Sequence, residues 1–223
     1  LVGTLAQNGS YGVSVGRNLA ADLVTMTGNA LGGAQIGHDE EARSRGTTGS
    51  TSLLSGCTIG SNQGDGVRLL GNVDLGITGC NIVDNTGYGV SNLNHWAQVD
   101  ATGNWWGSAD GPDSGDTHGA VNATGHLGTP VRLVVTPGPE PHGLRGDDLV
   151  ATFTLGNLTE TIATYTIQAD QSLTWQLQLD SADLTVEPGS RGDVTVTLTV
   201  PSDAPPGEAN ALTLTVTDQA DGN

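Results

Sequence analysis

The stretch Ile59-Gly60-Ser61-Asn62-Gln63-Gly64-Asp65-Gly66-Val67 decides the fold, because its arrangement returns along the first half of the chain. An apolar residue is followed three places later by an asparagine, and four places after that by a glycine with an apolar neighbour. Similar copies begin at Leu5, Met26 and Ile82, and a degenerate copy begins at Ala101. The repeated asparagines are Asn8, Asn29, Asn62, Asn85 and Asn104, at intervals of 21, 33, 23 and 19 residues.

A repeat of this length is too short for a strand–helix–strand crossover with its loops. It fits one coil of a β-solenoid, in which each coil buries its apolar face only by stacking on its neighbours. Alternation of period two, as in Gly66-Val67-Arg68-Leu69, indicates half-buried strands. The long interval contains a charged insertion, His38–Arg45, which we expect to form a loop.

Stacked coils place equivalent residues in columns, about 4.8 Å apart from one coil to the next. One predicted interior column contains Leu5, Met26, Ile59, Ile82 and Ala101. Another, two residues earlier, contains Gly3, Val24, Cys57, Cys80 and Val99. The five asparagines would form an amide ladder at a turn, where stacked side chains bond one another and the backbone. We expect the glycine after each asparagine to supply a backbone angle that other residues disfavour.

These repeats resemble the parallel β-helix repeats of pectate-lyase-like and surface-exposed bacterial or archaeal proteins. The stretch Val99–Gly107, with Gly111-Pro112, is similar to an Asn-Trp-Trp-Gly…Gly-Pro signature that closes many such helices. The resemblance implies an all-β chain with a right-handed parallel β-helix of about four to five coils over residues 1–107. A cap and linker would follow over 108–130. Trp105 and Trp106 would plug an end that otherwise exposes apolar side chains and strand edges.

The residue composition changes after Pro130: glycine becomes rarer, and Thr alternates with Val. Short alternating segments separated by turn residues predict an antiparallel β-sandwich over 131–223. The expected strands are 131–136, 148–155, 162–169, 173–179, 182–186, 193–200 and 211–216.

The segment from Glu187-Pro188-Gly189 to Pro205-Pro206-Gly207 resembles the Ig-like domains that are appended to secreted prokaryotic glycosidases and surface proteins. In that family a further strand usually follows the segment that matches residues 217–221. The resemblance therefore implies that one sheet edge of this sandwich is open, and an open edge can pair with a donated strand.

The composition excludes several partners. The formal net charge is −17, with 24 carboxylates against 7 basic residues, all of them Arg. A nucleic acid or an anionic membrane surface requires a positive face, and none is evident. No apolar run approaches the length that spans a bilayer. The sequence does not start with Met and starts as if inside a repeat, so we expect a processed product or a segment of a longer precursor.

Cys57 and Cys80 occupy the same position in consecutive coils. The distance between the Cα atoms of stacked strands lies within the range that a disulfide tolerates. An oxidising compartment would permit that bond, and two small buried thiols are the alternative.

Asp110, Asp113 and Asp116 lie in a glycine-rich loop and offer oxygen ligands suited to calcium. A solvated turn with Asp as turn former is the favoured interpretation.

Sequons at Asn122 and Asn157 lie in expected loops and would accept glycan if the organism glycosylates.

The resemblance to lyases implies an outward groove with acidic ligands and a basic proton acceptor. The outward positions here are Ser14, Gln35, Arg68 and Ser91, of which only one is charged. We therefore extend the resemblance to fold and not to activity.

We expect a non-catalytic extracellular structural protein, such as a cell-surface stalk, a surface-layer component or a fibre component. It would need no cofactor other than the calcium considered above. It would associate through its open β-helix end and sandwich edge, with itself or with neighbouring domains of the same precursor. One alternative is a polysaccharide-binding or adhesion module, in which Tyr11 and Tyr88 share a repeat position. Another is the C-terminal fragment of a polysaccharide lyase or hydrolase whose catalytic coils lie upstream.

Overall fold

The computed structural model describes residues 1, 3–37, 50–94 and 96–220, and it divides the chain into two compact units. The first unit is Leu1–Arg132 and the second is Leu133–Asn223. Both are built from β-strands, and the described residues contain no helix. The charged insertion His38–Arg45 lies outside the described residues.

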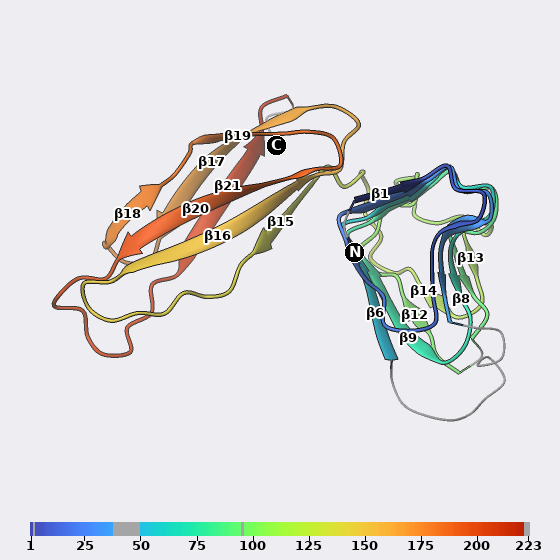
Figure 1. Ribbon diagram of the computed structural model, residues 1–223, viewed down its shortest axis with the longest axis horizontal. Coiled ribbons are helices and arrows are strands. Elements are labelled where there is room, and N and C mark those ends of the chain that lie inside the picture. The colour runs from blue at the N-terminus through green and yellow to red at the C-terminus, as the bar shows by residue number, and fades with distance from the viewer. Residues whose placement is uncertain (2, 38–49, 95, 221–223) are drawn as a thin grey trace. The chain divides into compact units, whose positions relative to one another are not determined.

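The first unit is a parallel β-solenoid in which the chain visits three sheets in turn (Figure 1). The first sheet contains β1 (Gly3–Ala6), β4 (Val24–Thr27), β7 (Thr58–Gly60) and β10 (Asn81–Val83). The second contains β2 (Tyr11–Val15), β5 (Gly32–Ile36), β8 (Asp65–Leu69), β11 (Val90–Asn92) and β13 (Thr117–His118). The third contains β3 (Ala20–Asp22), β6 (Ser50–Ser55), β9 (Val73–Thr78), β12 (Val99–Asp100) and β14 (Val121–Asn122).

The strand register confirms the predicted interior columns over the first four coils. Leu5 pairs with Met26, Met26 with Ile59, and Ile59 with Ile82. The inner members Met26 and Ile59 have no exposed surface, and each contributes roughly 2 kcal/mol through burial of its apolar area. One continuous core therefore runs along the coils, as expected for a repeat whose units cannot bury an apolar face alone.

The turn between the first and second sheets uses glycine for a different reason from the predicted one. The left-handed residue precedes each ladder asparagine: Gln7, Gly28, Ser61 and Asp84 have φ values of 55°, 66°, 54° and 54°. The glycines four places after the asparagines do not have positive φ. A Cβ on Gly66 would lie 2.5 Å from the carbonyl oxygen of Gly89 and 2.8 Å from Nδ2 of Asn85. These glycines are required because the next coil leaves no room for a side chain.

The fifth coil corrects the predicted register. Trp105 pairs with Asn81, so Asn104 continues the column of Cys80 and Trp106 continues the column of Ile82. Asp100 pairs with Gly76 in the third sheet, so its neighbours Val99 and Ala101 do not belong to the columns predicted for them. The interval between Asn85 and Asn104 is 19 residues, shorter than the other three intervals, because Asn104 lies in the column of Cys80 and not at the turn of the other asparagines.

Within residues 108–130, predicted to be a cap and linker, two short strands continue the second and third sheets. β13 pairs with β11, and β14 pairs with β12, both in parallel. The backbone N–H of Leu127 donates to the carbonyl of Asn104 at 2.9 Å. Strands of two residues contain no alternation that a sequence pattern can reveal, and this explains why they were missed.

Asn81 fixes the last residues of the solenoid. Its Nδ2 donates to the carbonyl of Val131, and its Oδ1 accepts from the N–H of Val131, both at 2.8 Å. One side chain thus satisfies both backbone groups of a residue 50 positions away, close to the unit boundary at Arg132. No sequence signal singled out Asn81, because its position lies outside the repeated motif.

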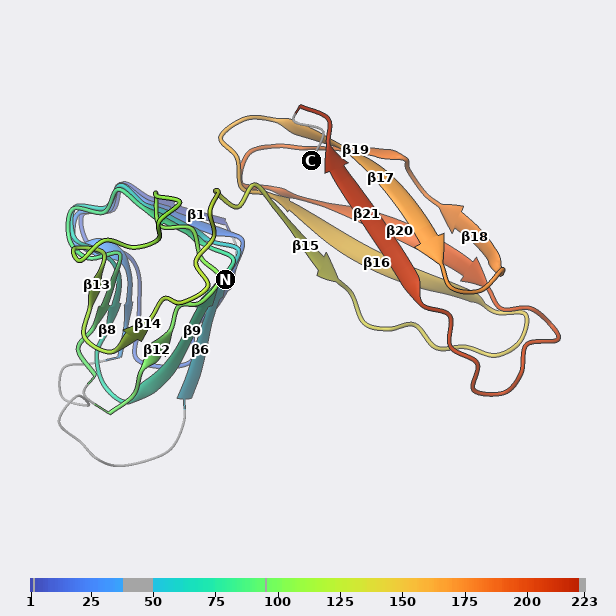
Figure 2. The ribbon, with the colours of Figure 1, turned by 180° about the vertical axis from the view of Figure 1, so that it is seen from behind.

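The second unit contains two antiparallel sheets that share one core (Figure 2), and all seven predicted strands are present. One sheet has the order β15 (Leu133–Pro137), β16 (Asp148–Asn157), β20 (Arg191–Thr199) and β18 (Gln176–Leu179). The other has the order β19 (Asp183–Val186), β17 (Ala163–Gln171) and β21 (Leu212–Asp218).

Alternation explains the sandwich. Along β20, Val194 and Val196 are fully buried, while Thr195 and Thr197 between them are half-buried on the outer face. Tyr165 and Ile167 are likewise buried at alternate positions along β17 of the opposite sheet. Apolar residues at every second position therefore meet between the sheets, which is the arrangement that the Thr/Val pattern predicts.

We expect substitution of Gly66 by Ala to destabilise the solenoid by about 3 kcal/mol, because the new methyl group would overlap backbone and ladder atoms. Gly9→Ala is the matched control, since a Cβ at Gly9 meets nothing within 4 Å and Gly9 has no positive φ. Equilibrium denaturation of both variants measures the effect. Equal stabilities for the two would contradict the close packing described here.

Candidate functional site

The asparagine ladder runs along the solenoid and is formed by four of the five predicted residues. Oδ1 of Asn29 accepts from the backbone N–H and from Nδ2 of Asn8, at 3.1 and 2.8 Å. Oδ1 of Asn62 accepts the same two bonds from Asn29, both at 3.0 Å. Oδ1 of Asn85 accepts them from Asn62, at 3.3 and 2.9 Å. Each oxygen thus points toward the preceding coil, and the ladder has a direction.

The second hydrogen of each Nδ2 group reaches back to the preceding coil. Asn29 donates to the carbonyl of Leu5 at 2.9 Å, Asn62 to Met26 at 3.0 Å and Asn85 to Ile59 at 3.0 Å. Asn29 and Asn62 have no exposed surface, so their amides are satisfied entirely by neighbouring coils. Buried amides of this kind stabilise only when every group has a partner.

Asn104 does not belong to this ladder. Its Oδ1 accepts from the backbone N–H of Cys80 at 2.9 Å, and its Nδ2 donates to the carbonyls of Ile77 and Ala101 at 2.7 and 2.8 Å. One coil earlier, the backbone N–H of Cys57 donates in the same manner to Sγ of Cys80, at 3.2 Å. Asn104 therefore ends the cysteine column with a stronger acceptor than sulfur.

Cys57 and Cys80 are stacked as the register predicts, and both are free thiols with no exposed surface. Cys57 Sγ lies 3.3 Å from the carbonyl of Ser55, and Cys80 Sγ lies 3.3 Å from that of Thr78. Burial raises the pKa of the Cys80 thiol well above its usual value. The sequence left open a disulfide or two small buried thiols, and the structure contains the two buried thiols.

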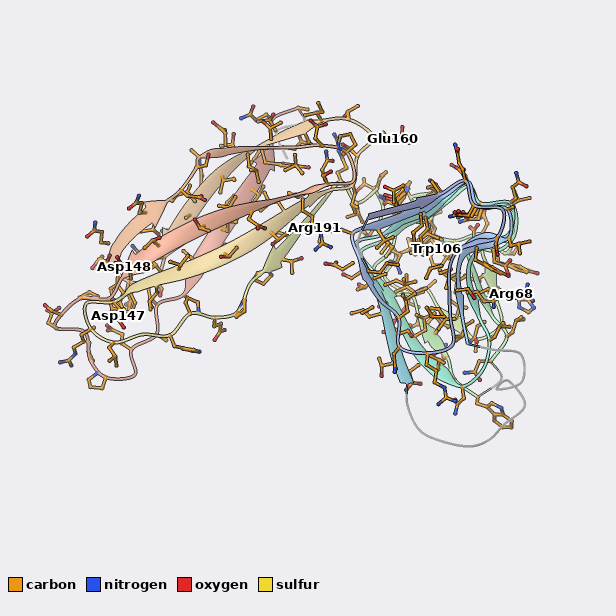
Figure 3. All side chains as sticks on the ribbon, viewed as in Figure 1. Arg68, Trp106, Asp147, Asp148, Glu160 and Arg191 are labelled. Carbon is orange, nitrogen blue, oxygen red and sulfur yellow. The ribbon has the colours of Figure 1, made fainter. Side chains whose placement is uncertain are left out.

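Trp105 and Trp106 lie at the last coil. Trp106 is 5 % exposed and packs in the core, whereas Trp105 is half-buried and continues the first sheet. Figure 3 shows Trp106 within the solenoid. A Cβ on Gly89 would lie 3.1 Å from the ring of Trp106, so the indole fits directly beneath the glycine column.

The acidic loop forms a turn. The backbone N–H of Asp113 donates to the carboxylate of Asp116 at 2.6 Å, and the N–H of Asp116 donates to the carbonyl of Asp113 at 3.0 Å. The N–H of Asp110 donates instead to Oγ of Ser108. Within the described ranges, no three His, Cys, Asp or Glu side chains gather where they could hold a metal ion. The bonds of Asp113 and Asp116 are those of a turn in which an Asp side chain satisfies a backbone N–H.

The two sequons differ in accessibility. Asn157 is 1 % exposed, and its Nδ2 donates to the carbonyls of Thr161 and Val186 at 2.8 and 2.9 Å. Glycan at Asn157 is thus incompatible with the fold, which corrects that expectation. Asn122 is half-buried on β14, and its Oδ1 accepts from both the N–H and Oγ1 of Thr124.

The outer face of the second sheet carries a polar column of Ser14, Gln35, Arg68, Ser91 and His118. Nε of Arg68 is buried and has no hydrogen-bond partner among the described residues, and Figure 3 shows Arg68 at the flank of the solenoid. Nearby, the rings of Tyr88 and His118 lie 4.9 Å apart at 34°. Tyr88 is exposed, and its N–H donates to Asp65. No sequence pattern places His118 in this column, because β13 has only two residues and shows no alternation.

The first coil is the most exposed part of the ladder and of the core. Leu5, Val13 and Val15 point inward but remain half-exposed, whereas their partners Met26, Ala34 and Ile36 have no exposed surface. β1, β2 and β3 each have only one neighbouring strand among the described residues. Apolar side chains, strand edges and the end of the ladder therefore coincide at this coil.

No family model matches the chain, and no curated protein matches its sequence. Among the residues that the structure describes, none forms a helix long and apolar enough to cross a membrane.

We expect Asn62→Ala to destabilise the solenoid by on the order of 3 kcal/mol, because it leaves donors of Asn29 and the carbonyl of Met26 buried without partners. Asn8→Ala should cost less than about 1 kcal/mol, since Asn8 is exposed and its bonds reach only one neighbour. Denaturant unfolding of both proteins compares the two. A smaller loss at Asn62 than at Asn8 would refute the ladder's structural role.

Proposed function

We propose that this chain is a non-catalytic structural protein of the cell surface, in which the solenoid is a rigid stalk and the sandwich is a joint or spacer. The observation that carries the proposal is the first coil, where strand edges and half-exposed inward residues face solvent together. Such a surface favours association with another protein segment, because burying apolar area and pairing strand edges both stabilise the contact.

The sandwich supports the same role. Within the described residues β21 pairs only with β17, and its inward residues Leu212, Leu214 and Val216 are half-buried. We regard this unit as an Ig-like domain and its β21 edge as a second place where a strand can be added. A protein with open edges on two separate units is suited to linking neighbours within an assembly.

The stack itself is suited to bearing load. The first four coils are joined by three side-chain ladder bonds, and they also share parallel sheets and one core. The net charge of −17 keeps the surface soluble and disfavours nonspecific adhesion of like-charged copies. These properties support a scaffold in an extracellular setting.

We expect the purified chain to associate with rising concentration, and sedimentation velocity and electron microscopy measure this. Val13→Lys should reduce association at least tenfold, because it places a charge on the half-exposed inward face of β2. Ser14→Lys is the matched control, since Ser14 points outward on the same strand. Dispersed monomers at every concentration, or equal loss in both variants, would contradict association through the first coil.

A second function, polysaccharide binding on the flank, is favoured by the exposed Tyr88–His118 ring pair. An aromatic ring that faces solvent can stack on the apolar face of a sugar. Its neighbours on the same column, Gly32 and Asp65, interrupt the strip toward Tyr11, so the platform is short.

If the flank binds polysaccharide, Tyr88→Ala should weaken binding about tenfold on a glycan array or in a pull-down. Tyr11→Ala should leave it unchanged, because the described residues place no second ring beside Tyr11. Absence of binding to every polysaccharide tested would remove this second function.

A further inference from the structure

The two units of the chain differ in charge. Residues 133–223 contain 13 carboxylates and 2 basic residues, for a formal net charge of −11. Residues 1–132 contain 11 carboxylates and 5 basic residues, for a formal net charge of −6. The sandwich therefore carries nearly twice the net charge of the solenoid on fewer residues.

Three of these carboxylates lie on the outer face of the sheet that contains β16, β20 and β18. Asp193 lies on β20, and Asp148 begins β16 opposite Thr199 of β20. Asp180 follows β18, where its N–H donates to the carbonyl of Thr195. All three side chains are exposed. Because outward positions along a strand are about 7 Å apart, the three carboxylates lie within about 20 Å of one another.

Each of the three carboxylates accepts a hydrogen bond from an uncharged hydroxyl group. The donor–acceptor pairs are Thr154–Asp193 at 2.7 Å, Thr195–Asp180 at 2.8 Å and Thr199–Asp148 at 2.7 Å. Arg191 is the one basic residue on β20, and it lies at the opposite end of this sheet from Asp148 (Figure 3). A hydroxyl group holds a carboxylate in place but leaves its negative charge uncompensated.

The outer face of the other sheet has the same chemistry. Oδ1 of Asp183 accepts from Oγ1 of Thr166 at 3.1 Å and from Nε2 of Gln219 at 2.8 Å. Asp170 is exposed and accepts from the backbone N–H that follows it, at 2.8 Å. The strands β19, β17 and β21 contain no basic residue. Both outer faces of the sandwich thus combine carboxylates with neutral donors.

The salt concentration decides whether these charges repel one another. The screening length is about 10 Å at 0.1 M salt and about 3 Å at 1 M salt. Carboxylates at separations of about 7 to 20 Å therefore interact in dilute salt and are screened in concentrated salt. An unfolded chain separates its charges further, so this repulsion destabilises the folded sandwich selectively in dilute salt.

From these charges and contacts we infer that the sandwich is adapted to concentrated salt, and that it opens before the solenoid when the salt is diluted. The solenoid responds less, because its ladder and core consist of uncharged groups. Screening by the bulk electrolyte is the cause, and no individual cation site is required. This inference goes beyond the proposed structural function and does not rest on it.

Amide hydrogen exchange of the full chain, followed by mass spectrometry, tests the inference. Peptides from β16 and β20 report on the sandwich, and peptides from β7 and β8 report on the solenoid. Between about 0.1 M and about 2 M NaCl, we expect exchange to slow about tenfold in the sandwich and less than about threefold in the solenoid. The solenoid is the internal control, because salt effects on apolar burial and on intrinsic exchange act on both units.

A variant with three substitutions tests the charges directly. The sandwich variant carries Asp148→Asn, Asp180→Asn and Asp193→Asn. Asparagine keeps an oxygen that accepts from the threonine hydroxyl but removes the negative charge. We expect slower exchange of β16 and β20 in dilute salt, and loss of about half of their response to salt. The matched control neutralises three exposed carboxylates of the solenoid, by Asp74→Asn, Asp84→Asn and Asp100→Asn, and should leave exchange in the sandwich unchanged.

Equal responses of the two units to NaCl would overturn the inference, as would an undiminished response of the sandwich variant. Calcium chloride at about 1 mM that reproduces the effect of concentrated NaCl would also overturn it, because such dilute calcium screens little and would have to bind at a discrete site. The measurements use a protein concentration at which the chain is monomeric. The inference and the proposed association through the first coil are therefore tested separately.

Discussion

The hydrogen bond from one asparagine side chain to the next is the interaction on which the solenoid depends. It is made at the turn between the first and second sheets, and it fixes each coil one rung from its neighbour. Asn29 and Asn62 are fully buried there, so a register slip would leave several amide groups without partners. The ladder thus contributes more to specifying the register than to net stability.

The glycine column follows from the ladder. Because the amide groups stand directly against the neighbouring coil, the residue four places later is left no volume for a Cβ. The left-handed residue before the asparagine turns the chain toward the second sheet, and Ser61 and Asp84 adopt this angle without being glycine. A short polar side chain at that position is tolerated in the left-handed region, whereas bulk at the glycine column is not.

The sequence could predict the fold to the extent that its pattern repeats. Four asparagines, the columns of Met26 and Cys57 and the seven sandwich strands were found, because alternation and spacing report burial directly. The fifth coil was misread, since Asn104 satisfies the motif locally but its pairing with Cys80 is a long-range contact. Asn81 and His118 were missed for a related reason: their roles depend on partners in the short strands and the segment that follow residue 107.

A ladder with a direction makes the two ends of the stack chemically different. At Asn8 the exposed group is an acceptor with one spare N–H, and at Asn85 the Nδ2 group retains only its bond to Ile59 among the described residues. In the inner coils both the acceptor and the second N–H of the side chain are satisfied by neighbouring coils. Addition at the last coil must first accommodate Trp106 and the segment that reaches Leu127. The direction of the amide bonds and the packing of the last coil thus give the described stack a polarity from Asn8 to Asn85.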